Sequence, residues 1–148
     1  MRRGLVIVAL TAALIGPAKA FDFEPGTPLD VPKLAPEMQA NVLGAWEIRD
    51  KSGKKRCRII LQKEFTIGGY QADVAPGCDK AFPVMADISA WRLLEGWTID
   101  LVDPIRRVRV RFETPDNRYV VFGDPKDIAG IYEIVKVKDT QGGGPRKP

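Results

Sequence analysis

Histidine is absent from this chain of 148 residues. Histidine is the commonest general base near neutral pH, the usual partner of a serine or cysteine nucleophile, and the commonest zinc ligand. Carboxylates remain, such as Asp100 with Asp103 and Asp73 with Asp79, but acids on or beside strands are typical of solvated faces and turns. We therefore predict a protein that is not an enzyme, with no catalytic residues, no cofactor and no metal site.

Long apolar runs are also scarce, and the one that exists lies at the N-terminus. Residues 4–15 are uncharged and mostly apolar, they follow Arg2 and Arg3, and residues 16–20 end with Ala18-Lys19-Ala20. A basic start, a short apolar run and small residues at an A-x-A site are typical of a secretory signal peptide. We expect cleavage after Ala20, and no transmembrane segment after processing. Residue 21 is Phe rather than Cys, so the mature protein should not carry a lipid.

Cysteine occurs only twice, as Cys57 and Cys78. Two cysteines in an exported chain of this size most simply form one disulfide, and a pair of free buried thiols is the alternative. A bridge that closes a loop of about 20 residues stabilises a small domain by about 3 kcal/mol.

Net charge is low once the signal peptide is removed. Residues 1–20 contain three basic residues and no acid, so Lys+Arg falls from 23 to 20 against 19 Asp+Glu, and the mature net charge is +1. The basic character of the whole chain therefore belongs largely to the export signal, and we expect no nucleic-acid partner.

Proline marks the first part of the mature chain. Residues 21–41 contain four prolines, Pro25, Pro28, Pro32 and Pro36. Prolines at this spacing prevent a regular helix and are excluded from the interior of a sheet. We expect an extended N-terminal arm over 21–41, with one helical turn over 36–40. Residues 139–148 are Gly-rich and typical of a disordered tail, which leaves 42–138 as one domain.

Within that domain, apolar and polar side chains alternate with a period of two. The clearest segment is 107–112 (RVRVRF), and such alternation is typical of half-buried strands. Eight segments are predicted to be strands: 43–49, 56–62, 67–74, 88–93, 97–102, 107–112, 118–123 and 130–137. Short connections make successive strands antiparallel neighbours. We predict an all-β fold, an eight-stranded antiparallel up-and-down barrel with an extended N-terminal arm, and a two-sheet sandwich is the alternative.

Two groups of side chains in this domain have two interpretations each. Arg107, Arg109 and Arg111 form a stripe that could bind an anionic partner such as a phosphate-bearing lipid, or a charged outward face that keeps the barrel soluble. The three tryptophans, Trp46, Trp91 and Trp97, could line a ligand cavity or fill the core. We favour the outward face and the core, because the side chains of an eight-stranded barrel just fill its interior.

Several short motifs recur in the order known from one protein family. They are LGAW at 43–46, RCRIIL at 56–61, PGC at 76–78, AWR at 90–92, GWTIDL at 96–101, a basic-apolar strand ending at Phe112, and GIYE at 130–133. The pattern resembles the proteobacterial alkaline-protease inhibitors over residues 41–137. Those are periplasmic proteins that block secreted zinc metalloproteases of the serralysin type, and related outer-membrane lipoproteins share the family. The resemblance implies an eight-stranded barrel, a disulfide between Cys57 and Cys78, and Trp46 and Trp91 in the core.

The resemblance also implies a mode of action. In the family an N-terminal arm enters the protease cleft, and its first residue approaches the catalytic zinc. A catalytic zinc keeps one open coordination position, to which a neutral α-amine can bind. After cleavage at Ala20 the residues in that role would be Phe21, Asp22, Phe23 and Glu24. This arm is longer than the family's, and its Phe-Asp-Phe-Glu start differs from the small-polar then aliphatic start of better-known inhibitors.

Two functions follow as hypotheses. The first is a monomeric periplasmic inhibitor whose protein partner is a metalloprotease. The second is a non-inhibitory binding or structural barrel of the cell envelope, which would use its mouth or the arginine stripe to hold an anionic or apolar ligand.

Overall fold

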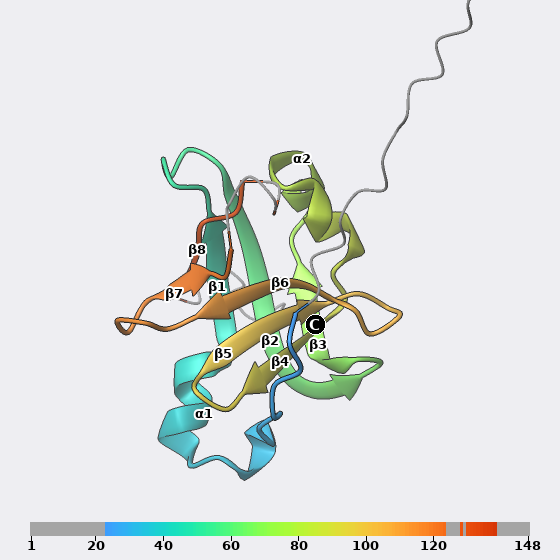
Figure 1. Ribbon diagram of the computed structural model, residues 1–148, viewed down its shortest axis with the longest axis vertical. Helices are drawn as coiled ribbons and strands as arrows, with labels where there is room; N and C mark the ends of the chain where they lie inside the picture. The colour runs from blue at the N-terminus through green and yellow to red at the C-terminus, as the bar shows by residue number, and fades with distance from the viewer. Residues whose placement is uncertain (1–22, 124–127, 129, 139–148) are drawn as a thin grey trace, which may run out of the picture.

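The computed structural model describes residues 23–123, 128 and 130–138, so the predicted signal peptide and C-terminal tail lie outside the described residues. Within these residues, eight strands and four short helices follow one another in sequence, and Figure 1 shows their arrangement. The strands are β1 (Gly44–Arg49), β2 (Arg56–Thr66), β3 (Gly69–Val74), β4 (Ala90–Leu94), β5 (Thr98–Val102), β6 (Val108–Glu113), β7 (Tyr119–Val121) and β8 (Glu133–Lys136). The helices are η1 (Val31–Lys33), α1 (Pro36–Val42), α2 (Cys78–Ala81) and η2 (Pro83–Asp87).

The strands form a closed antiparallel barrel in which each strand pairs with the next one along the chain. The barrel closes where β1 pairs with β8, with Trp46 opposite Lys136 and Arg49 opposite Glu133. This pairing excludes the two-sheet sandwich, because the first and last strands of a sandwich of this topology would remain edges. The predicted fold class is therefore confirmed.

The largest difference from the predicted strands is in β2, which runs to Thr66 instead of residue 62. Its pairing with β3 shifts between Leu61 and Phe65, which marks a bulge. Beyond the bulge the side chains of residues 63–66 are exposed, so this part of the strand lacks the alternation by which the sequence identifies a strand. The hairpin then turns at Gly68, whose φ of 97° favours glycine.

The barrel interior is filled by its own side chains. Trp46 and Trp91 are 3% and 0% exposed and belong to one apolar core, as the resemblance implies. Both indole N–H groups are satisfied: Trp46 donates to the carbonyl oxygen of Val42 at 2.8 Å, and Trp91 to that of Gln62 at 2.9 Å. Burial of large aromatic side chains with satisfied polar atoms makes these two residues structural. Trp97 differs, because it is only half-buried and lies at the β4–β5 turn.

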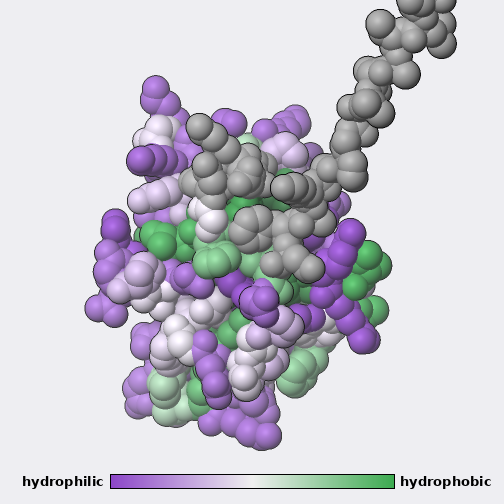
Figure 2. All heavy atoms as spheres, in the orientation of Figure 1, coloured by the Kyte–Doolittle hydropathy of each residue, from purple (hydrophilic) through white to green (hydrophobic). Residues whose placement is uncertain are grey.

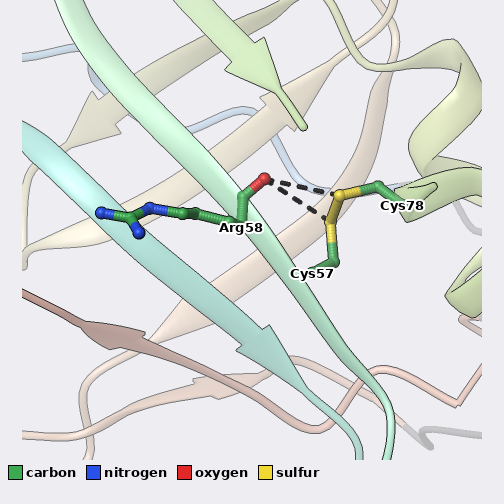
Figure 3. Close-up of a disulfide and its surroundings, with 3 residues drawn as sticks. All are labelled: Cys57, Arg58 and Cys78. Atoms are coloured by element: carbon green, nitrogen blue, oxygen red, sulfur yellow. Dashed lines mark hydrogen bonds between the residues drawn. A yellow bond between two sulfur atoms is a disulfide. The ribbon is translucent and has the colours of Figure 1, made fainter. Parts of the chain in front are cut away.

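One disulfide joins Cys57 of β2 to Cys78 at the start of α2, with 5.0 Å between the Cα atoms (Figure 3). The carbonyl oxygen of Arg58 lies 3.8 Å from one sulfur and 3.4 Å from the other. Because oxidised sulfur carries no proton, these are close contacts, and the N–H of Ala75 donates the hydrogen bond to this carbonyl at 3.0 Å. The disulfide thus attaches the segment 78–87 to the barrel wall.

The segment with α2 and η2 and the helix α1 lie at opposite ends of the barrel (Figure 1). The sequence pattern did not predict α2 and η2, which are too short to show a helical period. Their apolar side chains nevertheless enter the core, since Phe82 is 0% and Met85 2% exposed. At the other end, α1 includes the predicted turn at 36–40 and continues to Val42, which is also buried. No helix among the described residues is long and apolar enough to span a bilayer.

The described part of the arm, residues 23–35, lies on the barrel. The N–H of Leu29 donates to the carbonyl oxygen of Leu93 at 2.8 Å, and the N–H of Glu95 donates to that of Thr27 at 2.9 Å. Val31 is 0% exposed, and its N–H donates to the Tyr70 hydroxyl at 2.9 Å. The helix α1 also spans the predicted boundary between arm and barrel at residues 41 and 42. The second half of the arm is therefore part of the barrel's packing.

The surface seen from the side of the arm is mostly hydrophilic or intermediate, with green apolar patches that are most visible at its right edge (Figure 2). The exposed large apolar residues among those described are Met38, Phe65, Ile67, Ile105 and Phe122. Phe65 and Ile67 belong to the β2–β3 hairpin, and the other three lie in α1, in the β5–β6 turn and directly after β7.

Candidate functional site

The arm and the arginine stripe, two separate features of the sequence, meet on the outer wall of the barrel. Val110 and Phe112 of β6 point into the core, so Arg109 and Arg111 point outward. The beginning of the arm crosses this outward face, because Glu24 and Phe23 both contact Arg111. Phe21 and Asp22, the other two predicted protease-contacting residues, lie outside the described residues.

Arg111 is the centre of these contacts. Its Nε and Nη2 donate to the two carboxylate oxygens of Asp100 at 2.6 and 2.8 Å, which is a bidentate ion pair. Its Nη1 donates to the backbone carbonyl oxygen of Glu24 at 2.7 Å. The guanidinium carbon lies 5.2 Å from the centre of the Phe23 ring, within the range of a cation–π contact. The Phe23 ring is also 6.2 Å from that of Phe122.

The ion pair between Asp100 and Arg111 is buried although both residues face away from the core. Asp100 is 1% and Arg111 9% exposed, whereas the side chain of Glu24 is exposed. The hydrogen bonds to Asp100 raise the pKa of the Arg111 guanidinium, and burial opposes this effect. The sequence interpretation of Asp100 as a solvated residue is therefore wrong, because the register places it opposite Arg111 on the neighbouring strand.

The other two arginines of the stripe also have carboxylate partners. Arg107 Nε donates to Asp103 at 2.9 Å, and Arg109 Nη1 donates to Asp87 at 2.9 Å and lies 3.6 Å from Asp103. Burial by itself raises the pKa of Asp103, but hydrogen bonds from the backbone and side chain of Arg107 outweigh it, so the pKa lies below its ordinary value. Asp103 lies in a turn, as the sequence interpretation allows, but the solvation expected for it is wrong, since it is 2% exposed. With these charges neutralised locally, the stripe is a weak attractor for an anionic partner.

A shallow cleft of about 270 Å³ lies between α1 and the turns β4–β5 and β6–β7. Its lining is uncharged: Asn41, Val42, Trp97, Thr114, Asn117 and Tyr119. Burial raises the pKa of Tyr119 to about 12, and the centre of its ring lies 5.4 Å from that of Trp46 in an edge-to-face arrangement. The sequence pattern drew attention only to Trp97 of this set, because the other side chains come from segments that the fold alone brings together.

A metal site is not among these arrangements. Over the stretches 23–123, 128 and 130–138, no three Asp, Glu, His or Cys side chains are grouped so that they could hold a metal ion. The arrangement that the described residues offer is a rigid barrel with a peptide arm fixed on its wall.

Comparison with known protein families shows what this chain is similar to. A family model described as "Protease inhibitor Inh" matches residues 37–124, which includes nearly all of α1 and the strands β1 to β7. The matched region contains Cys57, Cys78 and both core tryptophans, but it begins at residue 37 and so leaves out most of the predicted arm over 21–41. No curated protein and no solved structure matches the chain significantly.

Proposed function

Because the chain belongs to the Inh family of protease inhibitors, we propose that it is a periplasmic inhibitor of a secreted zinc metalloprotease, with an N-terminal arm that enters the protease cleft. The observation that carries the proposal is the family match over the disulfide-linked barrel. The family description supports inhibition of a protease. The class of protease, the compartment and the arm mechanism are parts of the proposal.

The proposed compartment follows from the start of the chain. Residues 1–20 have the composition of a cleaved signal peptide, and a disulfide between Cys57 and Cys78 is stable in an oxidising compartment. N-terminal sequencing of the protein purified from the periplasm should give Phe21 as the first residue. A mature chain that begins elsewhere would change which residues reach the protease.

The proposed mechanism uses the free amine of Phe21. An α-amine has a pKa near 8, so a substantial fraction is neutral at pH 7 to 8 and can bind the open position of the protease's zinc. Phe21 and Asp22 would then occupy the subsites beside the metal. The barrel contributes by holding the following residues, since an arm that is already ordered loses less entropy on binding.

The experiment that tests the arm compares two forms of the protein. One begins at Phe21 and the other at Gly26, and both keep Val31 and the hydrogen bonds of Thr27 and Leu29 with the barrel. We expect the shorter form to remain folded, which its melting curve checks, and to have an inhibition constant that is at least about 100-fold higher. A start near residue 34 would be a poor comparison, because it removes the buried Val31. Equal inhibition by the two forms would contradict the arm mechanism.

The second hypothesis, an envelope barrel that binds an anionic or apolar ligand, has less support. All three arginines of the stripe have carboxylate partners, and the core side chains fill the barrel interior. Salt-sensitive binding to vesicles of anionic lipid, lost when Arg107, Arg109 and Arg111 are changed to Gln, would favour this function over inhibition.

A further inference from the structure

We propose that Arg111, braced by Asp100, is a positioning residue that fixes the arm on the barrel at Phe23 and Glu24, so that only the residues before Phe23 project toward a protease. The proposal rests on the proposed function and goes beyond it, because it names the residue that sets how much of the arm is free. Four contacts carry it: two hydrogen bonds to Asp100, one to Glu24, and the ring of Phe23.

The first step is that the guanidinium is oriented by the barrel alone. Asp100 on β5 lies opposite Arg111 on β6, and two parallel hydrogen bonds fix the plane of the guanidinium. Its remaining nitrogen, Nη1, then points at the carbonyl oxygen of Glu24 at 2.7 Å. A lysine at this position could donate to Asp100 but could not present the same planar fork to both partners.

The second step is that Phe23 and Glu24 of the arm bind the oriented guanidinium of Arg111 from its outer side. The Phe23 ring covers the guanidinium at 5.2 Å and lies 6.2 Å from the ring of Phe122, which precedes the β7–β8 connection. The Phe23 ring and the backbone carbonyl oxygen of Glu24 therefore contact the same guanidinium. We call Arg111, Asp100, Phe23 and the Glu24 carbonyl the arm seat.

The third step is that the chain is held again shortly after the arm seat. Gly26 lies so close to Leu94 that a Cβ at this position would meet the Leu94 side chain. Thr27 and Leu29 then exchange hydrogen bonds with Glu95 and Leu93. With both attachments closed, the two residues before Phe23 in a chain that begins at Phe21 span at most about 7 Å. With the arm seat open, the six residues 21–26 would span about 20 Å.

The structure favours the closed arm seat as the form that binds the protease. Opening it would exchange a charge-assisted hydrogen bond and a cation–π contact for contacts with water, and would expose the ion pair of Arg111 with Asp100 to solvent. A closed arm seat also keeps the free amine within a short reach of Arg111, and that pre-organisation strengthens binding.

The test uses the mature protein with Arg111→Lys, and with Arg109→Lys as the matched control. Arg109 lies on the same strand and also faces outward, but it pairs with Asp87 and Asp103 instead of the arm. Both variants keep their positive charge, so the barrel should remain folded, which melting curves check. The first readout is the rate at which chymotrypsin cleaves the Phe23–Glu24 bond, followed by mass spectrometry. We expect about a tenfold faster cleavage in Arg111→Lys and no change in Arg109→Lys.

The second readout is the inhibition constant for a secreted zinc metalloprotease of the serralysin type. We expect this constant to rise about tenfold in Arg111→Lys only. Unchanged cleavage in Arg111→Lys would overturn the arm seat. Faster cleavage with an unchanged or lower inhibition constant would overturn positioning, since the arm would then bind after release. If the wild-type protein inhibits no secreted metalloprotease, the proposed function fails, while the cleavage rates still decide whether Arg111 fixes the arm.

Discussion

At the scale of single residues, the β5–β6 hairpin contains two acids that are almost completely buried, Asp100 on β5 and Asp103 in the turn. A different segment of the chain covers each of them. The arm covers Asp100 together with Arg111, while the β5–β6 turn wraps around Asp103. Asp103 accepts hydrogen bonds from the N–H groups of Ile105 and Arg107 and from the Arg107 side chain, which is the pattern of an acid that organises a turn.

Replacement of Asp103 by Asn should therefore destabilise the protein in a pH-dependent way. We expect the free energy of unfolding to fall by about 1–3 kcal/mol at pH 7, because charge-assisted hydrogen bonds are lost. The pKa of Asp103 in the folded protein lies below the ordinary 3.8, so its contribution is fully present above about pH 4 and is lost as the pH falls through the folded-state pKa. Urea unfolding of wild type and Asp103→Asn at pH 7 and pH 3 measures this. The difference between the two proteins should be smaller at pH 3 than at pH 7, and an equal difference at both pH values would contradict the role of the charge.

At the scale of elements, two segments outside the barrel strands close its ends. The disulfide attaches α2 and η2, which bring Phe82 and Met85 into the core. The arm attaches by hydrogen bonds to the end of β4 and brings in Val31. The segment with α2 and η2 is held by a covalent bond, whereas the arm is held by hydrogen bonds and packing. Loss of the disulfide and loss of the arm's packing should therefore lower the free energy of unfolding for different reasons.

Removal of the disulfide, by changing Cys57 and Cys78 to Ala, should lower the free energy of unfolding by about 3 kcal/mol. The cause is the larger conformational freedom of the unfolded chain once the loop, with its sequence separation of 21, is open. Denaturant unfolding under non-reducing conditions measures the effect. A difference below about 1 kcal/mol would show that the core contacts of Phe82 and Met85 hold this segment without the covalent link.

Replacement of Val31 by Ala should destabilise the barrel itself, by about 1–2 kcal/mol. Val31 is fully buried, although it belongs to the predicted arm. If residues 27–31 were a free leader, the substitution would leave the unfolding midpoint unchanged. Thermal or urea unfolding of Val31→Ala beside the wild type decides between these outcomes.

At the scale of the whole molecule, the closed barrel presents no strand edge to a second chain, because β1 pairs with β8. Apart from Phe65 and Ile67 of the β2–β3 hairpin, the exposed apolar side chains of the described residues come from separate elements, and residues 21–148 have a net charge of only +1. The molecule is therefore suited to act as a rigid support for one arm.

We accordingly expect the mature protein to be a monomer at micromolar concentration. Light scattering coupled to size-exclusion chromatography, over a tenfold or larger range of concentration, is the measurement. A mass that rises to that of a dimer with concentration would contradict this expectation and would point to the exposed residues Phe65, Ile67 and Ile105 as a contact surface.

The sequence by itself determined the class of fold. Alternation with a period of two depends only on local side-chain pattern, so it identified all eight strands, and it erred mainly where that pattern stops, as in the second half of β2. The two cysteines were sufficient to expect one disulfide, because no other pairing exists within the chain.

Only the tertiary structure decided what the arm and the arginines do. Phe23 and Arg111 are far apart in the sequence, and nothing local indicates that one covers the other. The pairing of Arg111 with Asp100 depends on the strand register, and their burial depends on the path of a segment distant in the chain. Periodicity shows which way a side chain points relative to its own strand. Which residues cover an outward-pointing side chain depends on the tertiary structure.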